Sequence, residues 1–213
     1  MPLRAAVLAL LAFMVSLQGL AATPILLNEV AGRVGDQWVT VQDAYIFRTL
    51  QRMRAGTKPL ELLERGQALA KTVQKVMFEQ MLVMEARATD FKEESPTELK
   101  RLQKLVETNE IALEWQRFLK KYGLSTTDVW GRVRMALLAE RFLKKKLENL
   151  TPVIAEVEIE QFMKNNPEKV KNLSGDKRAF VAEAIKKDRV DKGLQDYIDF
   201  LVQKYNALSL LKE

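Results

Sequence analysis

The segment Val73–Ala86 constrains the fold most, because it has the spacing of a helix with apolar residues on almost every face. Its apolar residues are Val73, Val76, Met77, Phe78, Met81, Leu82, Val83 and Met84. A helix that is apolar nearly all round lies in the middle of a domain, with other helices packed against it. Polar residues, among them Lys75, Glu79, Gln80 and Glu85, interrupt the segment, and it is too short to span a bilayer, which needs roughly 20 apolar residues. We therefore expect a mainly α-helical domain built around this helix.

Residues 1–21 have the pattern of a secretory signal peptide. Arg4 supplies a positive start, Ala5–Leu17 is an unbroken apolar stretch, and Gly19 and Ala21 are small residues at the two positions that a signal peptidase recognises. The alternative is an uncleaved membrane anchor, which is disfavoured because the apolar stretch is shorter than the roughly 20 residues of a span. We expect cleavage near Ala21 and export of the remaining chain, residues 22–213, as a single domain.

The composition excludes several classes of enzyme. The 213 residues include no cysteine and no histidine. Thiol chemistry, disulfides, Ser-His-Asp triads and the usual zinc and haem ligation are therefore impossible. The net charge of +6, or +5 without Arg4, is spread among acidic residues, apart from the run Lys144–Lys146. We expect no enzymatic activity, cofactor, metal, nucleic-acid partner or small-molecule substrate.

Turn and capping signals divide the N-terminal half into elements. Gly35-Asp36 joins two short strands, Val30–Val34 and Gln37–Thr40, into a hairpin. Capping boxes, in which a hydroxyl and an acidic side chain satisfy each other's backbone amides, predict three helix starts. They are Thr40–Asp43, Ser95–Glu98 and Ser125–Asp128. The first helix ends at Ala55-Gly56, a helical turn is predicted at 60–65, and a helix over 111–122 ends before Gly123.

The C-terminal third predicts a short helix, a loop, a long helix and a strand. The short helix covers Val157–Met163, and Pro167–Asp176 is interpreted as a polar loop. The long helix runs over Arg178–Tyr205, and we expect it to bury Leu194, Ile198, Leu201 and Val202. Ala207–Leu211 is short, apolar and strand-like.

The order of these segments resembles the SurA-type periplasmic chaperones, specifically their N-terminal chaperone domain plus C-terminal helix. The resemblance covers roughly Val30 to Leu211. It rests on the segments RVGDQWVTVQDAYIF, LAKTVQKVMFEQMLVMEA, KKYGLSTTDVWGRVRMALLAERFLKKKL, VIAEVEIEQFMKNNP and KDRVDKGLQDYIDFLVQKYNALSLL. It implies a periplasmic location and a helical domain whose C-terminal strand pairs with the N-terminal hairpin. The first part of that domain is predicted at 28–165, and the closing helix and strand at 178–211.

Two features depart from the family. Parvulin-type prolyl isomerase domains normally lie before the C-terminal helix, and the short segment Pro167–Asp176 leaves no room for one here. Ala155 stands where relatives usually have a polar residue that caps the start of the short helix. The resemblance therefore implies a chaperone without prolyl isomerase activity.

As function, the resemblance implies an ATP-independent holdase that binds unfolded or extended segments of envelope, outer-membrane or secreted proteins. The residues predicted to bind peptide are Trp115, Phe118, Tyr122, Trp130, Leu138 and Phe142. The competing interpretation places such side chains in the core. A second hypothesis is a dedicated, non-catalytic partner of one envelope or secretion complex. A third hypothesis is an enzyme that uses Glu156, Glu158 and Glu160 as acid and base; it is rejected because these residues alternate along a short helix and are interpreted as solvated. The clients and the oligomeric state are left open.

Overall fold

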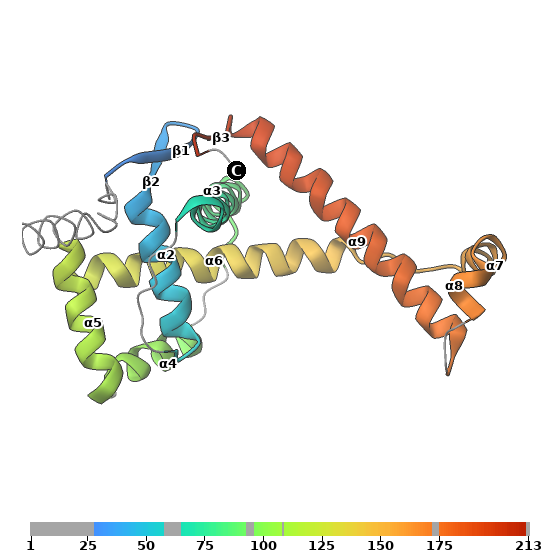
Figure 1. Cartoon of the computed structure of the whole chain (residues 1–213), viewed down its shortest axis with the longest axis horizontal. Coiled ribbons are helices and arrows are strands. Elements are labelled where there is room, and N and C mark those ends of the chain that lie inside the picture. The colour runs from blue at the N-terminus through green and yellow to red at the C-terminus, as the bar shows by residue number, and fades with distance from the viewer. Residues whose placement is uncertain (1–27, 58–64, 93–95, 108, 172–174, 212–213) are drawn as a thin grey trace, which may run out of the picture.

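The computed structural model describes residues 28–57, 65–92, 96–107, 109–171 and 175–211. The predicted signal peptide, Ser95 and nearly all of the helical turn predicted at 60–65 lie outside these ranges. The described residues form eight helices and a three-stranded antiparallel sheet (Figure 1), which confirms the prediction of a mainly α-helical fold. None of these helices is long and apolar enough to cross a membrane.

The sheet joins the two ends of the described chain. Strands β1 (Val30–Val34) and β2 (Gln37–Thr40) form the predicted hairpin, and Gly35 in its turn has a φ of 57°. This left-handed conformation suits glycine because it has no Cβ. Strand β3 (Leu208–Ser209) pairs antiparallel with β1, giving the order β2-β1-β3. The C-terminal strand therefore pairs with the hairpin as expected, although it is shorter than predicted.

Helix α3 (Gly66–Ala88) is the central element of the fold. It contacts α2 (Val41–Arg54), α6 (Thr126–Leu150), all three strands and the last helix. Met77 and Met81 are buried in the main core, and Met84 packs against it. The interpretation of Val73–Ala86 as the central core helix is confirmed.

Two further helices complete the main body. Helices α4 (Pro96–Glu107) and α5 (Asn109–Tyr122) precede α6 and pack against each other. Both described capping boxes have the expected hydrogen bonds: the Thr40 hydroxyl accepts from the Asp43 amide, and the Ser125 hydroxyl accepts from the Asp128 amide. In each case the acidic side chain also accepts from the capping residue's own amide. The local sequence therefore determines where these two helices begin.

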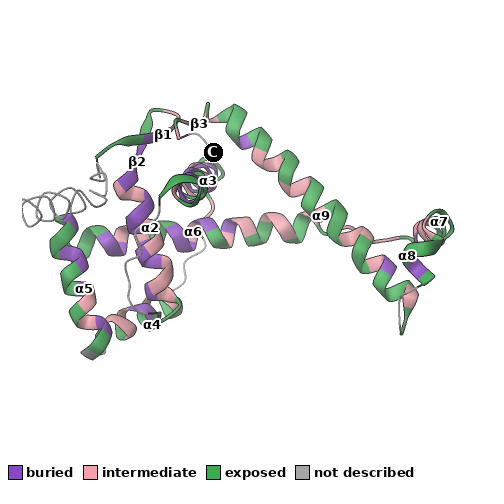
Figure 2. Ribbon diagram, viewed as in Figure 1, coloured by how far each residue is buried: buried purple, intermediate pink, exposed green. Residues whose placement is uncertain are grey.

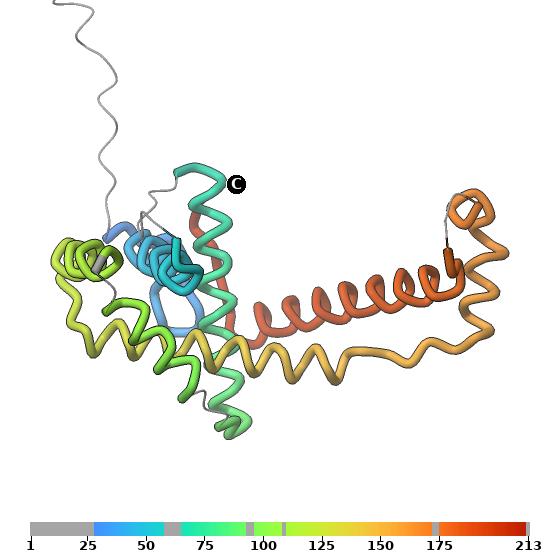
Figure 3. The backbone as a smooth tube through the Cα atoms, turned by 90° about the horizontal axis from the view of Figure 1, so that it is seen from below, coloured from blue at the N-terminus to red at the C-terminus, as the bar shows by residue number. Residues whose placement is uncertain are grey.

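A projecting arm extends from the main body. It contains the C-terminal end of α6, the short helices α7 (Glu156–Asn165) and α8 (Pro167–Lys171), and α9 (Lys177–Lys204), which returns to the sheet (Figures 1 and 3). Its tip has a separate small core of Ile159, Val170 and Val181.

The predicted loop Pro167–Asp176 is wrong in its first half, because residues 167–171 form helix α8. Proline is tolerated in a first helical turn, where its missing N–H has no partner to lose. Val170 is buried at the tip, and this burial stabilises the extra turn. At the start of α7, Ala155 provides no side-chain cap, but the Glu158 carboxylate accepts a hydrogen bond from the Ala155 amide.

The predicted burial of α9 is also partly wrong. Of the four residues expected inside, only Leu201 is fully buried; Leu194 and Ile198 are half-buried, and Val202 is 38% exposed (Figure 2). Because α9 bridges between the sheet and the arm tip, it presents only a narrow face to its neighbours. It crosses α6 at Gly193, where a Cβ would lie 3.3 Å from the Leu150 side chain.

The C-terminal end of α9 is anchored to α3 by a buried carboxylate. Glu85 accepts hydrogen bonds from the Lys204 ammonium at 2.6 Å and from the Tyr205 hydroxyl at 2.7 Å. Burial alone would raise the pKa of Glu85, but these two donors outweigh burial and lower it. The Tyr205 carbonyl also accepts from the Gly35 amide at 2.6 Å, so the last turn of α9 is tied to the hairpin as well.

Candidate functional site

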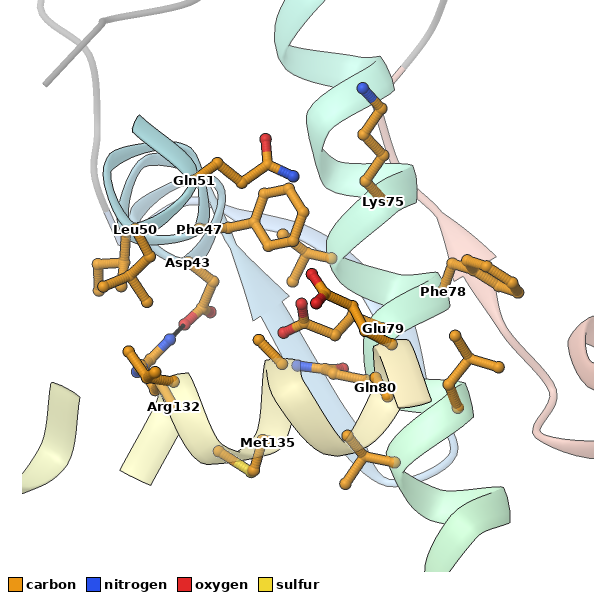
Figure 4. Close-up of a pocket in the computed structure, with 18 of the residues that line it drawn as sticks. Asp43, Phe47, Leu50, Gln51, Lys75, Phe78, Glu79, Gln80, Arg132 and Met135 are labelled. Carbon is orange, nitrogen blue, oxygen red and sulfur yellow. Dashed lines mark hydrogen bonds and ion pairs between the residues drawn. The ribbon is translucent and has the colours of Figure 1, made fainter. Parts of the chain in front are cut away.

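A surface groove of about 570 Å³ lies between α2, α3 and α6, with residues of β2 at one end. Apolar side chains make much of its wall, including Phe47, Phe78 and Met135 (Figure 4). The groove is open to solvent, since Trp38 and Met135 in its lining are 59% and 36% exposed. Its volume is typical of sites that enclose a drug-sized ligand, or a few side chains of a peptide.

Helical spacing explains why these side chains face one space. On α2 the lining residues Phe47, Leu50 and Gln51 are three and four residues apart, as side chains on one helical face are. The same spacing recurs on α3 and α6. The lining residues there include Val76, Glu79, Gln80 and Val83, and Arg132, Met135, Ala136 and Ala139.

Two ion pairs across the groove hold α2 against α6. Arg132 lies 2.9 Å from Asp43, and Arg54 donates to both carboxylate oxygens of Glu140 at 2.5 and 2.7 Å. Partly exposed pairs contribute at most about 1 kcal/mol each. Their main consequence is geometric, because they fix the distance between two walls of the groove.

Glu79 and Gln80 place polar groups between the apolar walls. None of the described residues forms an ion pair with Glu79 or donates a hydrogen bond to it, and the buried Oε1 of Gln80 has no partner either. Burial, with a smaller contribution from the neighbouring Glu140 charge, raises the pKa of Glu79 to about 7, against the opposing effect of Arg54 and Arg132. The groove therefore contains a carboxyl group that titrates near neutral pH.

Replacing Glu79 by glutamine is expected to stabilise the protein at alkaline pH. Between pH 4.5 and about 7 the folded chain keeps a proton that the unfolded chain has lost, so stability decreases as the pH rises through this window. A pKa raised from 4.5 to about 7 corresponds to at most about 3 kcal/mol. In urea unfolding, Glu79→Gln should gain about 1–3 kcal/mol over the wild type at pH 8 and little at pH 4.5.

The exposed Glu168 on α8 provides the control for this measurement. Glu168→Gln should leave the pH dependence of the free energy of unfolding as it is in the wild type. If Glu79→Gln did the same, Glu79 would not be the group that titrates near neutral pH.

The residues predicted to bind peptide do not line this groove. Five of the six are buried in the main core and only 3% to 9% exposed: Trp115, Phe118, Tyr122, Trp130 and Phe142. The sixth, Leu138, is half-buried. Four of these rings pack against one another: the ring centroids of Trp115 and Trp130 lie 5.9 Å apart, and those of Phe118 and Tyr122 5.3 Å apart. The ring of Phe142 packs instead against Phe91. Their placement fits the competing interpretation as core residues, because all five are buried in the main core and Trp115 and Trp130 fill the contact between α5 and α6.

The groove was missed at the sequence level because its apolar residues follow the same helical spacing as core residues. A usable signal was the polar interruption of the central helix. Glu79 lies four positions, about one helical turn, after Lys75, and Gln80 follows it directly; all three line the groove. Such an interruption marks the side of a central helix that is not covered by its neighbours.

A row of three side chains on one face of the sheet adjoins the groove. Arg33 of β1 is paired with Trp38 of β2 on one side and with Leu208 of β3 on the other, so the three side chains lie on one face. Trp38 and Leu208 are 59% and 53% exposed. Because Trp38 also lines the groove, apolar surface continues from the groove onto the sheet.

The acidic residues outside the groove bear on whether the protein could hold a metal ion. No group of three or more acidic residues in the described ranges could do so. The glutamates at the arm are paired: Arg178 contacts Glu156 and Glu160, and Arg189 contacts Glu158. These glutamates therefore form ion pairs that join α7 to α9.

Comparison with known proteins gives no relative from which a function could be transferred. No protein-family model, curated protein or solved structure matches this chain. The groove and the fold are therefore the basis for the proposed function.

Proposed function

We propose that the protein is an exported, ATP-independent holdase chaperone of the periplasm, without prolyl isomerase activity. It binds unfolded or extended segments of envelope proteins. The observation that carries this proposal is the solvent-open groove between α2, α3 and α6, which presents apolar side chains on three walls. The resemblance of the sequence to SurA-type chaperones supports the same conclusion.

The chemistry of the groove suits many client sequences rather than one. Met84 and Met135 are flexible, polarizable side chains that adapt to different apolar partners. Phe47 and Phe78 add large apolar surfaces. Binding would be weak, because ordering a flexible client offsets much of the contact energy. Weak binding allows release without ATP.

Removing exposed apolar side chains from the groove should reduce protection of clients without unfolding the protein. The test variant carries Trp38→Ser and Met135→Ser, since both residues are exposed lining residues. Its activity is measured as suppression of light scattering by a urea-unfolded outer-membrane protein after dilution. We expect several-fold weaker suppression and a nearly unchanged melting temperature, because surface substitutions usually change stability by about 0.5 kcal/mol or less.

Leu113→Ser is the matched control, because Leu113 is 65% exposed on α5 and does not line the groove. It should protect clients as well as the wild type does. If the wild type at several-fold excess leaves three unrelated clients unprotected, the holdase proposal fails. The protein would then be better described as a dedicated, non-catalytic partner of one envelope or secretion complex.

A further inference from the structure

The groove contains one acidic side chain that lacks a cationic partner among the described residues. Its charged lining residues are Asp43 and Arg54 of α2, Lys75, Glu79 and Arg87 of α3, and Arg132 and Glu140 of α6. Asp43 is paired with Arg132, and Arg54 with Glu140. This pairing leaves Glu79 as the unpaired carboxyl group.

The two cations of the lining that have no acidic partner among the described residues lie near the solvent rather than beside Glu79. Lys75 and Arg87 are exposed, and Figure 4 shows the Lys75 side chain directed away from Glu79 along the helix. The ring of Phe47 and the side chain of Glu79 both point into the space between α2 and α3 (Figure 4). A carboxylate among apolar side chains matches a ligand with an apolar stem and a positive head.

From this geometry we infer that the groove prefers extended client segments in which a lysine or arginine is flanked by apolar residues, with the cationic head placed at Glu79. The inference rests on the proposed function, and it specifies the client chemistry that the groove would select. Long basic side chains lay their methylene groups along apolar surface while the charge reaches a polar partner.

Ionised Glu79 is costly in the groove unless a positive charge accompanies it. The pKa of Glu79 is raised to about 7, first by burial and then by the Glu140 charge, despite Arg54 and Arg132. The site therefore binds a proton more readily than an exposed glutamate does, and a client ammonium or guanidinium group would replace that proton. Cationic clients should consequently bind better above pH 7, where Glu79 is ionised, than below it.

The test compares three fluorescein-labelled peptides that differ only at a central residue between apolar neighbours. This residue is lysine, norleucine, which keeps the stem without the charge, or glutamate. Fluorescence anisotropy with the full chain gives Kd at pH 8 and pH 6 in 150 mM salt, where long-range effects of the net charge are largely screened. We expect the lysine peptide to bind at least about threefold more tightly than the norleucine peptide at pH 8, and the glutamate peptide to bind most weakly.

Two variants identify the residue responsible. In Glu79→Gln the advantage of lysine over norleucine should disappear at both pH values, and in the control Glu168→Gln it should persist at pH 8. Two results would overturn the inference: equal binding of the lysine and norleucine peptides by the wild type, or a lysine preference that survives Glu79→Gln. Either result would leave the holdase proposal intact. Failure of all three peptides to bind would overturn both.

Discussion

Truncation after Gly175 is expected to abolish cooperative unfolding of the main body. The deletion removes Leu201, which is fully buried in the main core, and β3, the third strand of the sheet. It also leaves the buried Glu85 without Lys204 and Tyr205. Losing a large core side chain costs about 2–5 kcal/mol, and an uncompensated buried charge about 3–5 kcal/mol. Together these losses approach the whole stability of a typical domain, about 5–15 kcal/mol.

Urea unfolding followed by circular dichroism, with a dye that binds exposed apolar surface, measures this effect. The milder variant Leu201→Ala should keep a cooperative transition and lose about 2–5 kcal/mol. The exposed Phe200 on the same helix gives the control, and Phe200→Ala should cost much less. A truncated chain that unfolds like the full chain would show that α9 is an appendage rather than a closing element.

Replacing Trp115 by alanine should produce the second large effect, a loss of about 3–5 kcal/mol. Trp115 is 3% exposed and contacts the rings of Phe118 and Trp130, so alanine would leave a cavity between α5 and α6. For a chain of this size 1 kcal/mol lowers the melting temperature by about 2–4 °C. Thermal unfolding should therefore show a decrease of about 6–20 °C.

Leu113→Ala on the same helix is the control for Trp115, because Leu113 is 65% exposed. Its melting temperature should stay close to that of the wild type. An unchanged melting temperature for Trp115→Ala, combined with lost protection of clients, would restore the original interpretation of Trp115 as a peptide-binding residue.

Features encoded by neighbouring residues could be predicted from the sequence. The turn at Gly35-Asp36 and the starts of α2 and α6 depend on side chains that bond to backbone groups within three residues. The central helix was also predictable, because its apolar residues cover nearly every face. The pairing of β3 with β1 was expected only from the resemblance to a family, since no local pattern specifies a partner that distant in the sequence.

Features that depend on which faces meet could not be predicted. The spacing of Leu194, Ile198 and Leu201 fits a buried helix, but α9 leaves the main body along most of its length. Helix α8 depends on the burial of Val170 at the arm tip, which no local pattern indicates. The rings of α5 and α6 and the groove residues share one kind of apolar spacing, and only packing decides that the rings are covered while Phe47, Phe78 and Met135 border open space.

Site-specific photo-crosslinking tests the central claim most directly, namely that the groove binds unfolded polypeptides. A photoreactive amino acid is placed at Met135 in the full chain, and in a second sample at Leu113, which is exposed away from the groove. Each sample is irradiated with a urea-unfolded outer-membrane protein immediately after dilution. The holdase proposal predicts crosslinks from position 135 that unrelated unfolded proteins compete away, and few from position 113. Equal crosslinking from the two positions, or none from position 135, would contradict it.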